Sequence, residues 1–193
     1  MIIHFICRGN CFRSIIAEAY LNSLGVKDTT AMSSGTVAAA EKADNRAYFQ
    51  STLDLLDRHG IRAFAKAGHG DQLTQSRLAE ADMTVCLNQR VYDECLQRVT
   101  FTGHPRIWSV ADVGEPGRIP TTDAQRELYR EEAYQEITRN VDLMITKDFI
   151  MATIKRNSHS RTGFYKPTNP VQIALTSMNA RSVASSCMHI QRT

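Results

Sequence analysis

The sequence lacks any apolar run long enough to cross a bilayer, although 42% of its 193 residues are hydrophobic. Because a bilayer-spanning helix needs about 20 consecutive apolar residues, we expect no membrane protein. The five cysteines are odd in number and irregularly spaced, which does not fit the disulfide framework of a small secreted domain. The N-terminal apolar run is too short for a signal peptide and has no basic flank. We therefore expect a cytoplasmic protein.

Acidic residues are absent from residues 156–193, which hold five of the basic residues. Five charges are sparse over this length, so a nucleic-acid partner is the minor alternative and no membrane partner is expected. From Asn157 onward the chain is polar and loses regular periodicity. We interpret residues 157–193 as a basic C-terminal extension, partly ordered or disordered, with at most a short helix near 171–180. The six histidines lack metal-ligand spacing, and we predict no metal site.

Short apolar runs alternate with longer segments of helical spacing along residues 1–156. The expected strands are 2–7, 29–36, 81–88 and 105–110. The expected helices are 14–25, 47–60, 75–81 and 124–156. The longest helix has an apolar set made of Leu128, Ala133, Ile137, Val141, Met144 and Ile145. This alternation predicts one α/β domain over residues 1–156, a three-layer doubly wound sheet of four parallel strands flanked by helices.

The stretch CRGNCFRS, from Cys7 to Ser14, joins the first expected strand to the first expected helix. At such a junction, backbone N–H groups and the helix dipole favour an anion, and Gly9 lets the chain turn tightly around it. We predict a phosphate-binding loop there, which phosphate, sulfate or vanadate should occupy. Its members are Arg8, Gly9, Asn10, Cys11, Phe12, Arg13 and Ser14.

Each polar member of this loop has an expected role. Cys7 should be the nucleophile, because the environment of a helix N-terminus favours the thiolate. The planar guanidinium of Arg13 suits two phosphate oxygens and can stabilise charge during phosphoryl transfer. Ser14 has two candidate roles, a hydrogen bond to the Cys7 sulfur or an N-terminal helix cap. Asn10 should hold the loop through hydrogen bonds to the backbone.

The segment CRGNCFRSIIAE resembles the signature of the low-molecular-weight protein tyrosine phosphatases, C-x-G-N-x-C-R-S-P-x-A-E. The matching positions are Cys7, Gly9, Asn10, Arg13, Ser14, Ala17 and Glu18. SSGT at 33–36 is similar to the family's S-A-G-T, and the resemblance covers roughly residues 1–150. It implies a cysteine-dependent phosphomonoester hydrolase with a phosphocysteine intermediate and no cofactor. Its substrate would be a phosphorylated protein or a small phosphomonoester.

The loop departs from the family pattern at its second cysteine. Phe12 stands where the family has that cysteine, and Cys11 lies one residue earlier. The resemblance therefore does not carry over a protective disulfide between Cys7 and Cys11. A small residue such as Cys11 at this position also resembles relatives that accept phosphoarginine.

The departing oxygen needs a proton donor, which a carboxylic acid on a facing loop can supply. The family's Asp-Pro pair is absent from RIWSVADVGEPG at residues 106–117. We favour Asp112 as the general acid, because the V-x-D ending of the strand is similar to the family's. Glu115 is the alternative, although its longer side chain would require a loop that stands further off.

In tyrosine-specific relatives, aromatic residues wall the pocket from two places, after the second strand and after the Asp-Pro pair. The corresponding residues of this sequence, 37–44 and 117–120, contain no aromatic residue. Phe12 and Tyr48 are the candidates to replace them. Two other functions stay open. One is an arsenate reductase in which Cys86 and Cys95 form a relay with Cys7. The other is a non-catalytic phosphate-binding module. The sequence leaves the physiological substrate and the oligomeric state open.

Overall fold

The computed structural model describes residues 1–159 of the chain, with side-chain surroundings up to residue 147. Residues Met1–Asp148 form one compact unit. Most of the expected C-terminal extension, including the short helix expected near 171–180, lies outside the described residues. Within the part that is described, no helix is both long and apolar enough to span a membrane.

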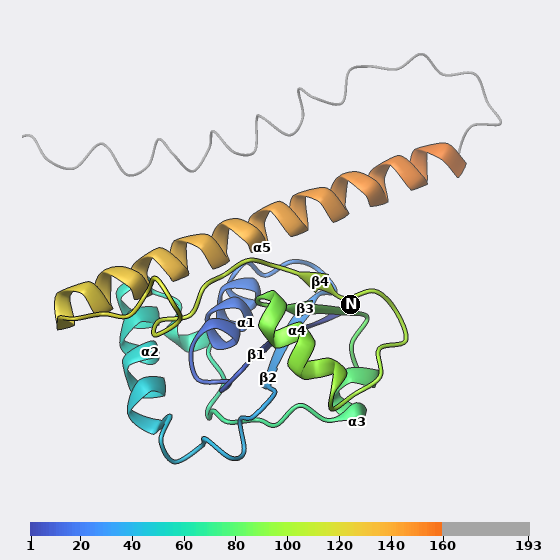
Figure 1. Ribbon diagram of the computed structural model, residues 1–193. Helices are drawn as coiled ribbons and strands as arrows, with labels where there is room; N and C mark the ends of the chain where they lie inside the picture. The colour runs from blue at the N-terminus through green and yellow to red at the C-terminus, as the bar shows by residue number, and fades with distance from the viewer. Residues whose placement is uncertain (160–193) are drawn as a thin grey trace, which may run out of the picture. The chain divides into compact units, whose positions relative to one another are not determined.

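Four parallel strands form the central sheet in the order β2-β1-β3-β4 (Figure 1). They are β1 (Ile2–Cys7), β2 (Thr30–Gly35), β3 (Met83–Cys86) and β4 (Arg106–Ile107). β1 pairs with both β2 and β3, so Phe5 lies between Ser33 and Val85. Parallel strands require long crossover connections, which the helices supply. The predicted sheet of four parallel strands is confirmed.

The helices are α1 (Arg13–Ser23), α2 (Arg46–Arg58), α3 (Gln75–Ala79), α4 (Gln89–Leu96) and α5 (Asp123–His159), with a short 3₁₀ helix, η1 (Arg62–Phe64). Glycines follow α1 and α2 at positive φ, 58° at Gly25 and 70° at Gly60. Glycine pays no steric penalty in this left-handed conformation, which explains why both helices end where the sequence places a glycine.

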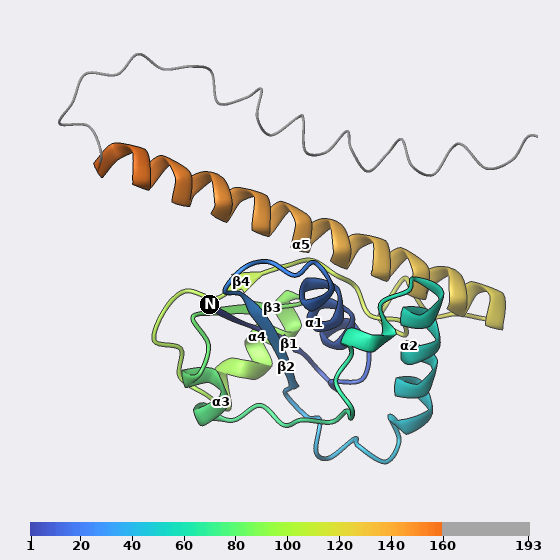
Figure 2. The same cartoon turned by 180° about the vertical axis from the view of Figure 1, so that it is seen from behind.

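Side chains of the strands alternate between the two faces of the sheet, and each face has its own core. On one face, Ile3 and Phe5 pack with buried residues of α1, α2 and α5. On the other, Ile6 and Cys86 pack with α3 and α4. Figures 1 and 2 view the molecule from opposite sides and show α4 and α1 on opposite faces. These are the three layers of the predicted doubly wound fold.

The fourth strand is shorter than expected, because regular pairing covers only Arg106 and Ile107 instead of residues 105–110. Pro105 has no N–H to donate, and Ile107 is exposed on the edge of the sheet. The chain nevertheless continues alongside β3. The N–H of Trp108 donates to the Cys86 carbonyl at 2.9 Å, and the N–H of Val110 donates to the Leu87 carbonyl at 3.0 Å.

The buried stripe of α5 also differs from the expectation. Its apolar members are Ala133, Tyr134, Ile137, Val141 and Met144. Leu128 was expected on this stripe but is 54% exposed, whereas Arg130 is only 1% exposed. The helical spacing of four and three residues runs back from Tyr134 to Arg130 and not to Leu128. An arginine therefore takes a core position.

Candidate active site

The predicted phosphate-binding loop connects the end of β1 to the start of α1. Cys7 is buried, and the N–H of Asn10 donates to its sulfur at 3.2 Å. The Ser14 hydroxyl lies 3.0 Å from the same sulfur. Helix α1 begins at Arg13, and the capping position is Phe12, which makes no side-chain cap. Of the two candidate roles of Ser14, the structure therefore has the contact with sulfur, and the helix-cap alternative is wrong.

Asn10 fastens the loop to the rest of the domain. Its φ is +49°, in the left-handed region that asparagine tolerates better than most residues. The side-chain amide donates to the hydroxyls of Ser14 at 3.0 Å and Ser33 at 2.8 Å. Its carbonyl oxygen accepts from the N–H of Asp71 at 3.0 Å. The expected role of Asn10 is thus present, and it reaches hydroxyls as well as backbone.

The end of β2 presses against the backbone of the loop at Gly35. A Cβ atom there would lie 2.5 Å from the Arg8 carbonyl oxygen and 2.8 Å from the Asn10 nitrogen. The following residue continues the contact, since the N–H of Thr36 donates to the Cys7 carbonyl at 3.1 Å. The glycine of the SSGT motif is therefore required by close backbone approach.

Arg13 holds Asp112, the predicted general acid, beside the loop through an ion pair. Its guanidinium is 2% exposed and donates to the Val110 carbonyl at 3.0 Å and to the Asp112 carboxylate at 2.5 Å. Burial raises the pKa of Asp112, and the charge of Arg13 opposes this rise. Cys7, Arg13 and Asp112, the three predicted catalytic residues, thus lie around one site.

Glu115, the alternative acid, has both carboxylate oxygens engaged. One accepts from the Asn88 amide at 3.0 Å, and the other accepts from the Asp112 N–H at 3.0 Å. Of the two carboxylates, Asp112 lines the cavity over the loop. Glu115 shapes the turn that presents Asp112.

The cavity over the loop has a volume of about 190 Å³ and is walled on one side by Phe12 and Tyr48. The two rings meet edge to face, with centroids 5.6 Å apart and planes at 81°. The two aromatic residues that the sequence offered for this wall therefore do lie in it. Asn45 and Glu41, which sequence reasoning missed, complete the rim.

The side chain of Arg8 does not add free positive charge to this rim. Its guanidinium pairs with Glu41 at 2.5 Å and with Glu94 at 3.5 Å. Glu94 is shared with Arg90, which lies 3.3 Å from the same oxygen. The Arg8 guanidinium is therefore already engaged by carboxylates at this rim.

The other three cysteines of the described residues, Cys11, Cys86 and Cys95, fall on two different faces of the sheet. Cys11 lines the cavity as a free thiol, and burial raises its pKa. Cys86 of β3 and Cys95 of α4 are fully buried together in the core that α3 and α4 form with the sheet. Both are free thiols; a hydrogen bond with Cys95 and then burial raise the pKa of the Cys86 thiol. Cys7 belongs to the core on the opposite face, so the sheet lies between it and the Cys86–Cys95 pair.

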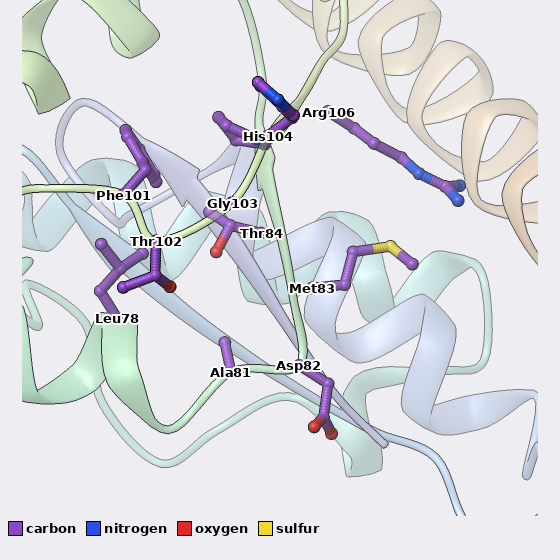
Figure 3. A pocket seen from close by; sticks show the side chains of 11 residues that line it. Leu78, Ala81, Asp82, Met83, Thr84, Phe101, Thr102, Gly103, His104 and Arg106 are labelled. Carbon is purple, nitrogen blue, oxygen red and sulfur yellow. The ribbon is translucent and has the colours of Figure 1, made fainter.

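A second hollow, of about 330 Å³, lies at the starts of β3 and β4. Figure 3 shows Leu78 and Phe101 at one end of it and Asp82 at the other, with Arg106 extending away from them. The Asp82 carboxylate accepts from the N–H of Ile2 at 2.7 Å, which fastens the first strand. The cavity is larger than the one over the loop, but no cysteine and no residue of the predicted phosphate-binding loop lines it. The predicted site residues line the smaller cavity.

The chain matches the family model described as low molecular weight phosphotyrosine protein phosphatase over residues 2–158. The chain belongs to this family. A search of curated protein sequences gives no match. This match confirms the resemblance seen in CRGNCFRSIIAE and extends it along nearly the whole described chain. The family consists of enzymes.

Solved structures of the family share the fold. The low molecular weight protein tyrosine phosphatase from T. tengcongensis is 22% identical, with a TM-score of 0.54 over 76% of this chain and 99% of that one. Wzb from Vibrio vulnificus, solved in complex with benzylphosphonate, is 19% identical, with a TM-score of 0.57 over 76% and 97%. A thioredoxin-dependent arsenate reductase from Corynebacterium glutamicum is 18% identical, with a TM-score of 0.54 over 78% and 62%.

Proposed function

We propose that this family member hydrolyses phosphomonoesters through a phosphocysteine formed at Cys7. The observation that carries the proposal is the pairing of Arg13 with Asp112 beside the buried Cys7 sulfur. It joins a nucleophile, a planar cation for the phosphoryl group and a carboxyl group for proton transfer in one cavity.

In the first step, the Cys7 thiolate attacks phosphorus and the bond to the departing oxygen breaks. The carboxylic acid form of Asp112 gives its proton to that oxygen, so no free alkoxide or phenoxide is released. Arg13 and the backbone N–H groups of the loop hold the phosphoryl oxygens while their charge is redistributed. The product is a phosphocysteine and an alcohol or phenol.

In the second step, the Asp112 carboxylate takes a proton from water, whose oxygen attacks phosphorus. The phosphorus–sulfur bond breaks, and its electron pair returns to Cys7. The hydroxyl of Ser14, 3.0 Å from the sulfur, stabilises this thiolate by donating a hydrogen bond to it. Phosphate leaves, and Asp112 is again protonated.

The ion pair between Arg13 and Asp112 supplies a way to load the acid. Without substrate, Arg13 lowers the pKa of Asp112 and burial raises it. When a phosphoryl group draws the guanidinium donors to its own oxygens, Asp112 loses that stabilisation and faces a new negative charge. Both changes raise its pKa further. Substrate binding thus favours the protonated form that the first step requires.

The cavity suits an aryl phosphate. Phe12 and Tyr48 form an apolar wall beside the phosphate loop, and an aromatic leaving group would bury apolar surface against it. This wall supports phosphotyrosine as a substrate.

Turnover of p-nitrophenyl phosphate by the wild type, Cys7→Ser, Asp112→Asn and Glu115→Gln variants tests the proposal. We expect Cys7→Ser to abolish turnover. With an alkyl phosphate, whose leaving group is poor, Asp112→Asn should slow turnover about 10²–10⁴-fold. Glu115→Gln keeps an oxygen for the Asp112 N–H and is the matched control.

Slow turnover in Glu115→Gln together with wild-type turnover in Asp112→Asn would reverse the assignment of the acid. An inactive wild-type protein that still binds vanadate would indicate a binding module.

The pH dependence gives a second test of the acid. Because burial raises the pKa of Asp112, this carboxyl keeps its proton to a higher pH than an exposed aspartate. Turnover should fall as pH rises through that pKa, since the acid loses its proton. Asp112→Asn should remove this descending limb. A limb that persists unchanged in Asp112→Asn would assign it to another group.

A further inference from the structure

A buried arginine lies behind the aromatic wall of the cavity. Arg130 of α5 is 1% exposed. Its guanidinium carbon lies over both rings of the wall, 4.9 Å from the centroid of Phe12 and 4.9 Å from that of Tyr48. Both rings line the cavity. Arg130 therefore backs the surface that faces a substrate's leaving group.

The charge of Arg130 is only partly matched. Its nearest carboxylate is Glu127, 3.6 Å from Nε and 51% exposed. Two of its nitrogens, Nε and Nη2, are buried without a hydrogen-bond partner among the described residues. Burial lowers the pKa of Arg130, but arginine keeps its charge near neutral pH. An incompletely paired buried charge costs stability. Stability of the fold therefore does not explain why an arginine occupies this core position.

This charge acts on the cavity through the two rings. A cation over an aromatic face is attracted by the negative potential of that ring. Once that attraction is used, the ring offers less to a second cation on its other side. The positive charge is also felt more strongly in the apolar surroundings behind the wall than it would be in water.

We propose that Arg130 is a specificity-determining residue, whose positive charge behind Phe12 and Tyr48 makes the cavity favour aryl phosphates over phosphorylated guanidinium groups. The inference rests on the proposed phosphatase function and names its substrate class. A phosphoarginine side chain would place its planar guanidinium group against the same wall. There the substrate's guanidinium group is repelled by the like charge of Arg130. Its cation–π attraction to the two rings is also weaker, because Arg130 already interacts with them. A phosphotyrosine ring carries no such charge.

The first test compares two peptides of one sequence, with phosphotyrosine or phosphoarginine at one position, in wild type and Arg130→Met. Methionine keeps an unbranched stem and removes the charge. We expect the ratio of kcat/KM values, phosphotyrosine over phosphoarginine, to fall about tenfold, in the range of a cation–π contact. Arg130→Lys retains the charge and should keep most of the ratio.

Arg126→Met is the matched control. Arg126 lies one turn earlier on α5, half exposed and paired with Asp123. Its removal takes the same charge from the same helix without touching the wall. The ratio should stay at the wild-type value. A fall in Arg126→Met equal to that in Arg130→Met would mean that general charge, and not the wall, sets the preference.

Binding separates this inference from the proposed chemistry. The Cys7→Ser protein is titrated with benzylphosphonate and with a guanidino-alkyl phosphonate, with and without Arg130→Met. We expect the preference for benzylphosphonate to shrink by the same factor as the kinetic ratio. If wild type hydrolyses nothing and this shrinkage is still seen, the proposed function fails and the inference stands.

An unchanged preference in folded Arg130→Met, in kinetics and in binding, would overturn the inference. Should Arg130→Met fail to fold, as judged by its thermal melt, Arg130→Gln and Arg130→Lys are compared instead. They differ in charge at similar polarity. Equal preferences in these two variants would also overturn it.

Discussion

At the scale of single residues, Asn10 joins stability to function. Asn10→Ala removes the hydrogen bonds of the side-chain amide with the Ser14 and Ser33 hydroxyls and with the N–H of Asp71. It also places alanine at a positive φ. We expect a loss of about 2–4 kcal/mol in the free energy of unfolding. Turnover of p-nitrophenyl phosphate should fall by at least tenfold, because the same bonds fix Ser14 beside the nucleophile.

Asn22→Ala is the control for this prediction. The Asn22 side chain bonds the N–H and carbonyl of Ala31 at 2.8 Å and 3.3 Å, at a distance from the loop along β2. Urea unfolding and steady-state kinetics of both variants should show lowered stability in each and slowed turnover in Asn10→Ala alone. Equal kinetics in the two would mean that Asn10 is only structural.

Residue identities in the loop could be predicted from the sequence, because a phosphate-binding loop depends on local order along the chain. Cys7, Arg13 and Ser14 are separated by a few positions, and the loop itself sets their geometry. Arg130 could not be found in this way, since its partners Phe12 and Tyr48 come from distant parts of the chain. Its one local signal is its place on the buried stripe of α5, one helical turn before Tyr134.

At the scale of elements, the contact between β2 and the loop depends on Gly35. Gly35→Ala would place a Cβ within 2.5 Å of the Arg8 carbonyl, so the loop must shift. We expect the dissociation constant for vanadate to rise at least tenfold, in line with the sensitivity of such sites to small displacements. Gly68→Ala, where nothing lies within 4 Å, should bind vanadate as wild type does. Wild-type binding by Gly35→Ala would show that the loop tolerates the shift.

His4, at the centre of the sheet, makes the stability of the fold depend on pH. It is fully buried on β1, its Nε2 lies 2.7 Å from the Ser34 hydroxyl, and burial, then Arg77 and Lys66, lowers its pKa from 6.5 to about 4. Between these values the unfolded chain binds the proton and the folded chain does not. Stability therefore rises with pH in this window and is lost as pH falls from 6.5 toward 4.

The expected size of this effect is about 1.5 kcal/mol between pH 6.5 and pH 5 for one group. Urea unfolding at these two pH values should show this loss in wild type and in His104→Gln, an exposed-site control. His4→Gln, which cannot titrate, should lose about 1.5 kcal/mol less over the same interval. Equal pH dependence in all three proteins would contradict a neutral His4.

Element types were predictable because period and glycine position report directly on backbone geometry, as at Gly25 and Gly60. The residues at which elements begin and end were less predictable. The fourth strand was expected over 105–110, yet regular pairing stops after Ile107. Pro105 has no N–H and accounts for the late start of the strand, but the sequence does not show where its pairing ends or which strands lie at the edges. The order β2-β1-β3-β4 is a property of the assembled sheet.

At the scale of the whole molecule, the sheet separates the cysteines of the described residues into two groups. Cys7 lies on the face covered by α1, α2 and α5, and Cys86 and Cys95 lie together under α3 and α4. A relay needs successive thiols to reach one another within disulfide distance. Cys7 and Cys86 end the neighbouring strands β1 and β3, and their side chains belong to the cores on opposite faces of the sheet.

We therefore expect no thioredoxin-coupled arsenate reduction, followed as NADPH consumption with thioredoxin and its reductase. Cys86→Ala should turn over p-nitrophenyl phosphate within about twofold of wild type, since it lies outside the cavity, while losing about 1–2 kcal/mol of stability as a buried group removed from the core. Arsenate reduction by wild type that disappears in Cys86→Ala would contradict this. It would require the Cys86–Cys95 pair to leave its core and cross to the face of Cys7, and so local unfolding of α4 during every catalytic cycle.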